Sequence, residues 1–530
     1  VGRMDRITSS RPVWKRPDLA LIVILAGVSL AGIVLILYAT NVAPWAFSDS
    51  AAYLTTAKNI AAGRGVVLQD YNGNYGLLPL HAPLYPIVLS LPVAFGAEAV
   101  QATRWLYAFL FGGTIFLAGW FTNHFCRSFW LSISASLLIL FGLESVTAFS
   151  GAMSEGLFIF LSLISLGLTS LALEKSGQKV HLLLAAGAAA GMAILARYTG
   201  LALLAAGGAA VFFLTKGRFS QRVKSLLLLI LPGLLVSAFW LVPVYGTSRT
   251  FGNRSLEALA NISGKVDLYF KSFLEILGSW LPFYYRGNHI ITPAQKLVLA
   301  LVLLAGLLFL AWRKRQPLAI EKSSVYSLKE WFVVLALFLG AYIILHLAAF
   351  TTAEIQPDIN GRLLLPVNIF GILLAATLAA YISRIFPKKW IGGLIFFLLT
   401  ILTVWYFHSD LKLYLFEMHN YGNGYTSKRW EGNQLFNEIV GLDTTLPLYS
   451  NNSALVLFYT ERFPQDLPLN TDQGKYAVDD RQNFALILFN DVGQKDLPNA
   501  YDQFVNSLRN GYSIVFENDE GIIFIPLDED

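Results

Sequence analysis

The segment from Asn41 to Gln101 holds the residues best suited to chemistry. It includes Trp-Ala-Phe-Ser-Asp at 45–49, so that Asp49 follows shortly after a long apolar stretch. If that stretch crosses a membrane, Asp49 stands at the water boundary, where partial desolvation tunes a carboxylate for general-base work. An Asp at this position also caps a following helix. The two roles are compatible, and the sequence leaves both open.

Two arginines are candidates for binding a phosphate group. Arg197 and Arg362 each stand at the end of an apolar stretch, where a charge is costly unless it is paired. The alternative is that they pair with a nearby acid, extend to water or contact lipid headgroups. The acids considered are Glu155, Glu354 and Asp358.

Glu155 also lies in apolar sequence and needs a partner. It is a candidate second acid, acceptor contact or metal ligand, or else it faces water together with Glu144. A zinc or magnesium site built from Asp49, His81 and Glu155 is conceivable, but no ligand spacing such as His-x-x-x-His supports it. The single cysteine, Cys126, excludes a Cys-based zinc site. The sequence thus leaves the metal unknown and requires no cofactor.

Long apolar stretches must position these residues. Of the 530 residues, 55% are hydrophobic and 14% are charged, and the mean hydropathy is +0.56. Soluble domains carry about 25% charged residues, so an ordinary water-soluble enzyme is excluded. A helix needs about 20 apolar residues to cross a bilayer. Eleven stretches are candidates: 19–40, 105–126, 128–143, 156–173, 180–196, 198–215, 225–246, 297–312, 331–350, 363–383 and 390–409.

Basic residues predict the orientation of these spans. With the N-terminus in the cytoplasm, the inside segments hold 20 Lys and Arg, whereas nine lie in the outside loops at 41–101 and 247–293 and at positions 197 and 362. Residues after 410 then lie outside, in a multi-pass protein of the cell (plasma or inner) membrane. The first span lacks an Ala-x-Ala cleavage signal, and we expect an uncleaved anchor. Two outside loops are long, at 41–101 and 247–293.

The chain after residue 410 has the composition of a separate domain. Residues 411–530 hold eight basic and eighteen acidic residues, a net charge of −10, whereas residues 1–410 carry +15. The net charge of +5 therefore reflects topology, and the low charge content leaves little room for nucleic-acid binding. The apolar pattern predicts helices at 428–441, 453–461 and 498–509, and strands at 447–450, 484–489, 513–517 and 521–526.

The two long outside loops have different patterns. In the first, we expect a helix at 50–62, with Ser48 or Asp49 as its cap and Gly63 as its stop, and another from Pro83 to about Val93. Both would lie along the membrane surface. In the second loop, aromatic residues beside basic ones suit sugar stacking or an interfacial belt, and we expect a wall of the substrate cleft there. These residues are Arg249, Arg254, Lys265, Lys271, Arg286, Tyr269, Trp280, Phe283, Tyr284 and Tyr285.

Several short motifs follow one another in order along the chain. Asp49 is followed by Tyr53, and later by a His-x-Pro-Leu-Tyr-Pro segment that runs from His81 through Tyr85. Three more are Met153-Ser-Glu-Gly-Leu-Phe158, Ala196-Arg-Tyr-Thr-Gly-Leu201 and Asn360-Gly-Arg-Leu-Leu-Leu-Pro366. This order resembles the GT-C superfamily of integral-membrane glycosyltransferases. The likeness is to bacterial relatives of dolichyl-phosphate-mannose protein mannosyltransferases and of the aminoarabinose transferase that modifies lipid A.

The resemblance implies a fold and an activity. The fold is a polytopic α-helical membrane protein, with a GT-C-like domain at 1–410 and a small extracytoplasmic α/β domain at 411–530. The activity is transfer of a sugar from a polyprenyl-phosphate donor to a glycan, lipid or protein acceptor on the outer face, with inversion. The departing lipid phosphate is already a stable anion, so no strong general acid is required. Many relatives need a divalent metal, and others do not.

The resemblance also implies roles for single residues. Asp49 takes the position of the family's general base. His81 takes that of a donor-phosphate contact, the alternative being an unspecialised loop histidine, and Tyr53 and Tyr85 are the expected cleft walls. Ser50 follows Asp49 where the protein mannosyltransferases have Glu, which weakens the case for a protein acceptor of their kind.

Two other functions were weighed against this one. A multispan transporter or flippase of lipid-linked sugars should carry charged residues in midspan, yet nearly all charges lie between the spans. A non-catalytic membrane scaffold would leave the long first loop unexplained. Glycosyl transfer is therefore the leading hypothesis.

Overall fold

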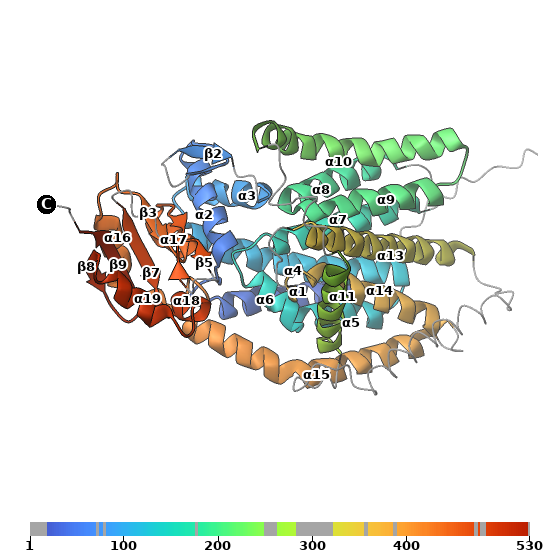
Figure 1. Cartoon of the computed structure of the whole chain (residues 1–530). Helices are drawn as coiled ribbons and strands as arrows, with labels where there is room; N and C mark the ends of the chain where they lie inside the picture. Colours follow the sequence, from blue (N-terminus) through green and yellow to red (C-terminus); the bar gives the residue numbers. More distant parts are fainter. Residues whose placement is uncertain are drawn as a thin grey trace, which may run out of the picture.

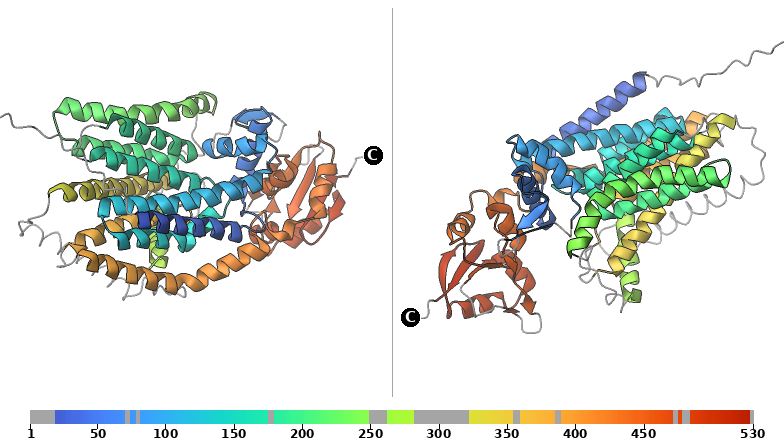
Figure 2. Two further views of the ribbon diagram at one scale, coloured as in Figure 1. Left: turned by 180° about the vertical axis from the view of Figure 1, so that it is seen from behind. Right: turned by 90° about the horizontal axis from the view of Figure 1, so that it is seen from above.

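The protein is a bundle of apolar helices with a small α/β domain at one end (Figure 1). The computed structural model describes residues 19–69, 74–77, 81–174, 179–248, 262–281, 322–353, 359–384, 389–470, 475–477 and 484–527. Two further views place the C-terminal domain at the same end of the bundle (Figure 2). The predicted fold class, a polytopic α-helical membrane protein with a small C-terminal α/β domain, is confirmed.

In the part of the chain that the structure describes, seven helices are long and apolar enough to cross a membrane. They are α1 (Leu19–Ala39), α4 (Ala99–Cys126), α7 (Glu155–Leu173), α10 (Phe219–Ser248), α13 (Lys322–Thr351), α14 (Leu365–Ser383) and α15 (Lys389–Tyr421). The apolar helices α8 (Val180–Ala196) and α9 (Leu201–Leu214) are shorter. The predicted stretch at 297–312 lies outside the described residues, so the total of eleven spans stays a prediction.

The stretch predicted as one span at 128–143 is a bent pair of helices. It consists of α5 (Phe129–Leu140) and α6 (Leu143–Phe149), whose axes differ by 57°. Gly142 between them has extended backbone angles, which interrupts the helical hydrogen bonds. The bend turns α6 toward the segment that precedes Glu155.

Small residues let the spans approach closely. A Cβ on Gly187 of α8 would lie 2.0 Å from the Leu229 carbonyl oxygen of α10, so only glycine fits at this crossing. Between α1 and α4, a Cβ on Gly112 would lie 2.6 Å from Ile33 Cγ1. Such contacts fix the relative positions of the helix ends, and the charged residues stand at those ends.

The first long loop folds into two helices, as predicted, and a small hairpin. These elements are α2 (Ser48–Ala61), β1 (Val67–Gln69), β2 (Tyr75–Leu77) and α3 (Leu84–Ala94). The predicted cap of α2 is wrong, because Phe47 is the N-cap and its N–H donates to the Ser50 hydroxyl at 3.1 Å. Asp49 instead lies inside the first turn, where its carboxylate is available to other partners.

The C-terminal domain is a five-stranded sheet in the order β4-β3-β7-β9-β8 with helices on both faces. Its strands are β3 (Leu448–Ser450), β4 (Gln465–Asp466), β7 (Ala485–Phe489), β8 (Tyr512–Glu517) and β9 (Gly521–Pro526); β5 (Leu469–Asn470) and β6 (Lys475–Tyr476) form a separate pair. Its helices are α16 (Gln434–Gly441), α17 (Ser453–Thr460), α18 (Asn490–Asp496) and α19 (Tyr501–Leu508). All five residues of β7 are buried, as expected of a central strand.

Two sequence predictions fail in this domain. The helix expected at 428–441 begins only at Gln434, because Gly432 has a positive φ of 67° and follows a single 3₁₀ turn. The helix α18 was not predicted, since its seven polar and small residues lack an apolar stripe. The other predicted helices and strands occur within a few residues of their expected bounds.

Candidate functional site

Four charged residues from separate parts of the chain meet at the end of the bundle that carries the C-terminal domain. Asp49 lies in the first turn of α2 and Glu155 is the first residue of α7. Arg197 follows the last residue of α8, and Arg362 lies in the turn before α14. Each stands at a helix end, so the bundle brings together residues that are up to 313 positions apart in the sequence.

Glu155 lies between the two arginines. Its Oε1 is 2.6 Å from Arg197 Nη1 and 3.3 Å from Arg362 Nε, and its side chain is only 3% exposed. Within the described part of the chain, neither Glu155 oxygen has an aligned hydrogen-bond donor. The attraction is therefore mainly between charges, and it offsets the cost of burying the carboxylate.

Of the two carboxylates, Asp49 and Glu155, Asp49 is the accessible one. Its side chain is 38% exposed, and its Oδ2 lies 3.7 Å from Arg362 Nη2. Arg362 thus contacts both carboxylates through different nitrogens, while 28% of its own side chain remains exposed. The arrangement leaves one carboxylate open to solvent beside a guanidinium that is also open.

Aromatic residues pack behind Asp49. The ring of Tyr53 lies 5.1 Å from that of His81 and 5.2 Å from that of Tyr85. Tyr53 donates to the Ser154 hydroxyl at 3.3 Å, next to Glu155 in the sequence. Tyr53 and Tyr85 are both buried, so they support the site from behind.

His81 lies beside this cluster in a position that disfavours its charged form. Burial lowers the pKa of His81, and the Arg197 charge lowers it further, although Asp49 opposes them. The backbone oxygen of His81 accepts from the Tyr198 hydroxyl at 3.3 Å. The imidazole is therefore neutral near pH 7 and carries one N–H that can donate.

Sequence reasoning missed a tyrosine on α13. The Tyr342 hydroxyl donates to the Leu363 carbonyl at 2.8 Å, directly after Arg362 in the chain. A tyrosine inside an otherwise apolar span is a weak signal, because most such residues only fill the core. This hydrogen bond holds the turn that contains Arg362 against α13.

Glu144 contacts other parts of the protein, whereas one interpretation of the sequence has it facing water. Its Oε1 accepts from Trp280 Nε1 at 3.4 Å, and a Cβ on Gly361 would lie 2.0 Å from its Oε2. Glu144 therefore packs against the turn that carries Arg362. Of the other acids weighed as partners, Glu354 and Asp358 lie outside the described residues.

The second long loop is described only in part. Its helix α11 (Ile262–Ser279) lies against α13, where the Tyr269 hydroxyl is 3.1 Å from His346 Nδ1. Lys265 donates to the carbonyls of Thr351 at 3.3 Å and Ala353 at 3.0 Å. The expected cleft wall stays a prediction. Lys271, also on α11, is exposed, and the other members lie outside the described residues: Arg249, Arg254, Phe283, Tyr284, Tyr285 and Arg286.

The donor set does not fit a divalent cation. The described residues contain no group of three or more His, Cys, Asp or Glu side chains close enough to hold a metal ion. Asp49 and Glu155 each face a guanidinium, which competes for the same carboxylate oxygens.

The helical bundle, the folded first loop and the C-terminal α/β domain together form a fold that solved structures share. The structure is similar to ArnT from Cupriavidus metallidurans in the apo state, with a TM-score of 0.54 and 13% identity over 96% of this chain and 98% of that one. It is similar to the oligosaccharyltransferase AglB from Archaeoglobus fulgidus, with a TM-score of 0.52 and 12% identity over 97% of this chain and 74% of that one. No protein-family model and no curated protein sequence matches the chain. The resemblance to the GT-C superfamily is thus confirmed at the level of the fold.

Proposed function

We propose that the protein is a membrane glycosyltransferase that moves a sugar from a polyprenyl-phosphate donor to an acceptor, with inversion. The observation that carries this proposal is the exposed Asp49 carboxylate next to the Arg362 guanidinium, in a GT-C fold. An acid and a cation side by side suit a reaction that removes a proton and releases a phosphate. The similar AglB was solved in complex with an inhibitory peptide and a dolichol-phosphate, which supports a lipid-phosphate donor here.

In the proposed reaction, Asp49 accepts the proton of the acceptor hydroxyl. The hydroxyl oxygen forms a bond to the anomeric carbon from the side opposite the phosphate, and the bond from that carbon to the phosphate oxygen breaks. The bonding electrons leave with the lipid phosphate. Arg362 stabilises the charge that develops on it, because a guanidinium binds phosphate oxygens through two parallel N–H groups.

Glu155 has a supporting role in this proposal. By pairing with Arg197 and Arg362, it holds both guanidiniums at the site before the donor arrives. Such preorganisation lowers the cost of arranging the donors during the reaction. His81 supplies an N–H to the donor phosphate. Tyr53 and Tyr85 hold the His81 ring in place.

We propose the orientation in which this end of the bundle faces outward. The inside segments hold 20 basic residues, an excess over the outside loops that supports an N-terminus in the cytoplasm. The C-terminal domain and the site then lie at the outer face of the cell membrane. The acceptor is a glycan, lipid or protein reached from that side.

A reconstituted assay tests the proposal. The purified protein in liposomes is given a panel of radiolabelled polyprenyl-phosphate sugars, with and without chelator, and Asp49→Asn is compared with wild type. Transfer by wild type and none by Asp49→Asn is the expected result. Movement of the donor across the bilayer without transfer would instead show a flippase.

A further inference from the structure

The C-terminal domain contacts the strand that leads into Asp49. Ala46 and Gly424 form a parallel β-bridge, in which Tyr425 N–H donates to the Ala46 carbonyl at 2.8 Å. Next to it, the Thr426 hydroxyl donates to the Pro44 carbonyl at 2.7 Å. These contacts join residues that are almost 380 positions apart, three to five residues before Asp49.

The other side of the same strand is held by the segment that leads into Glu155. Trp45 N–H donates to the Ser150 carbonyl at 3.0 Å, and Ala152 N–H donates to the Trp45 carbonyl at 2.8 Å. The indole Nε1 of Trp45 donates to the Thr147 carbonyl at 2.8 Å. The strand at 44–46 is therefore fixed between the membrane bundle and the C-terminal domain.

Only glycine fits at position 424. Its φ is +64°, and a Cβ there would lie 2.1 Å from the Ala46 carbonyl oxygen. A side chain would therefore push the strand at Ala46 away from the domain. Gly432 has a similar φ of +67° but no atom within 4 Å of a Cβ, so it provides a control for the backbone conformation alone.

The opposite end of α2 is also held by the C-terminal domain. Lys58 Nζ lies 2.6 Å from Glu461 Oε1, at the end of α17, which packs alongside α2. Both side chains are about half exposed, so this ion pair contributes little stability by itself. It does show that the domain contacts α2 near its C-terminal end, in addition to the segment before the helix.

We propose that residues 423–426 of the C-terminal domain position the Asp49 carboxylate for the reaction through the strand at 44–46. The inference rests on the proposed function, with Asp49 as base. The domain is then part of the catalytic unit, because a displacement of about 1 Å at a reacting group costs on the order of 10²-fold in rate. Gly424 acts through Ala46 and is a positioning residue.

The test compares Gly424→Ala with Gly432→Ala in the full-length protein. We expect Gly424→Ala to lower kcat by about 10²-fold with donor affinity near wild type, and Gly432→Ala to leave kcat within a few-fold. Hydrogen exchange of the amides at 44–50 should quicken in the first variant only. Equal exchange and equal kcat in the two variants would overturn the proposal, as would a loss of donor binding in step with kcat.

A milder variant covers the case in which Gly424→Ala does not fold. Thr426→Val removes the hydrogen bond to Pro44, and Thr426→Ser restores it, so kcat should fall in the first and recover in the second. Failure of Ser to recover kcat would contradict the positioning role. The exchange measurement needs no activity. Absence of transfer by the wild-type protein would therefore refute the proposed function. The hydrogen-exchange rates at 44–50 would still show whether the C-terminal domain holds the strand.

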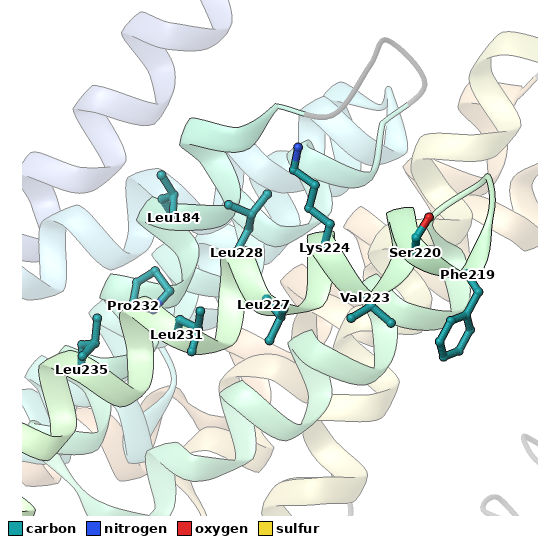
Figure 3. A pocket seen from close by; sticks show the side chains of 10 residues that line it. All are labelled: Leu184, Phe219, Ser220, Val223, Lys224, Leu227, Leu228, Leu231, Pro232 and Leu235. Atoms are coloured by element: carbon teal, nitrogen blue, oxygen red, sulfur yellow. The ribbon is translucent and has the colours of Figure 1, made fainter.

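A second and independent observation concerns the far end of the bundle. A groove of about 690 Å³ runs along α10 beside Leu184 of α8, from Phe219 to Leu235 (Figure 3). It is apolar except for Ser220 and Lys224 near one end. That end is remote from the catalytic site, since Trp240, further along α10, donates to the Tyr198 hydroxyl beside the site.

The helices that line this groove carry charge of a single sign, although Glu174 at the end of α7 and Glu330 of α13 lie near Lys216. Residues 179–248 contain no Asp or Glu. Their basic residues, apart from Arg197, gather where α8 begins and where α9 meets α10: Lys179, Lys216, Arg218, Arg222 and Lys224. An apolar groove that ends in clustered cations complements an acyl chain with an anionic headgroup.

We infer that this groove binds an anionic phospholipid, with Lys224 at the phosphate. The test is native mass spectrometry of protein taken from nanodiscs of phosphatidylglycerol or phosphatidylcholine. Wild type should retain phosphatidylglycerol, and Lys224→Ala should retain about fivefold less, as expected for the loss of about 1 kcal/mol. Lys412→Ala, at the other end of the bundle, is the control. Equal retention of the two lipids, or an equal loss in the control, would refute the inference.

Discussion

Glu155 Oε1 and Arg197 Nη1 are 2.6 Å apart where α7 begins and α8 ends, and the glutamate is almost fully buried. Each group depends on the other, because an unpaired charge at this depth is costly. The same Glu155 oxygen also faces Arg362, so one buried carboxylate supports two cations. Asp49 is the more exposed of the two carboxylates.

Asp49→Asn should abolish transfer without affecting folding. The amide keeps the shape of the side chain but cannot accept the proton, which costs about 10²- to 10⁴-fold in rate. Because Asp49 is 38% exposed, the thermal midpoint should stay close to that of wild type. Asp502→Asn, an exposed acid on α19, is the control. Transfer at the wild-type rate by Asp49→Asn would exclude this residue as the base.

Glu155→Gln should behave differently from Asp49→Asn. It leaves two guanidiniums without their buried counter-charge, so we expect a lower thermal midpoint as well as weaker transfer. The free energy of unfolding should fall by about 1 to 3 kcal/mol, since both arginines are partly exposed and can turn toward water. Thermal melts in detergent measure it. An unchanged midpoint would show that the carboxylate does not stabilise the arginine pair.

Arg362→Lys should weaken transfer even though it keeps the charge. Lysine cannot contact Asp49 and Glu155 through separate nitrogens of a rigid planar group. We expect a fall of about 10²- to 10³-fold in kcat/KM for the donor. Arg218→Lys, far from the site, should have no effect. Full activity in Arg362→Lys would show that a point charge suffices and that the contact of Arg362 with both carboxylates is not needed for catalysis.

The lowered pKa of His81 predicts a dependence of stability on pH. The unfolded state binds a proton at a pH near 6.5, whereas the folded state binds it only at a lower pH. Stability is therefore lost as the pH falls below about 6.5 toward the folded value. The thermal midpoint of wild type should fall more between pH 7 and 5 than that of His81→Gln. Parallel curves would mean that His81 is not held neutral.

The apolar spans could be predicted from the sequence because each depends on its own composition. The meeting of Glu155 with Arg197 and Arg362 could not, since the sequence offered three candidate acids and no means of choosing among them. Similarly, Asp49 was a reasonable cap on local grounds. The observed cap is Phe47, which directly follows Trp45 and Ala46. Those two residues form β-bridges with Gly151 and Gly424, which are more than 100 and more than 370 residues away. No local pattern contains that information.

The last helix, α15, runs without a break for 33 residues from the bundle to the C-terminal domain. At 1.5 Å per residue it is about 50 Å long, against a hydrocarbon core of about 30 Å. Its C-terminal end contacts the end of α1, where the rings of His419 and Tyr38 stack at 4.1 Å. A change in the tilt of this rod therefore moves the domain that grips the Asp49 strand. If Asp49 acts as proposed, we expect bilayer thickness, which sets the tilt through hydrophobic mismatch, to alter the geometry around its carboxylate.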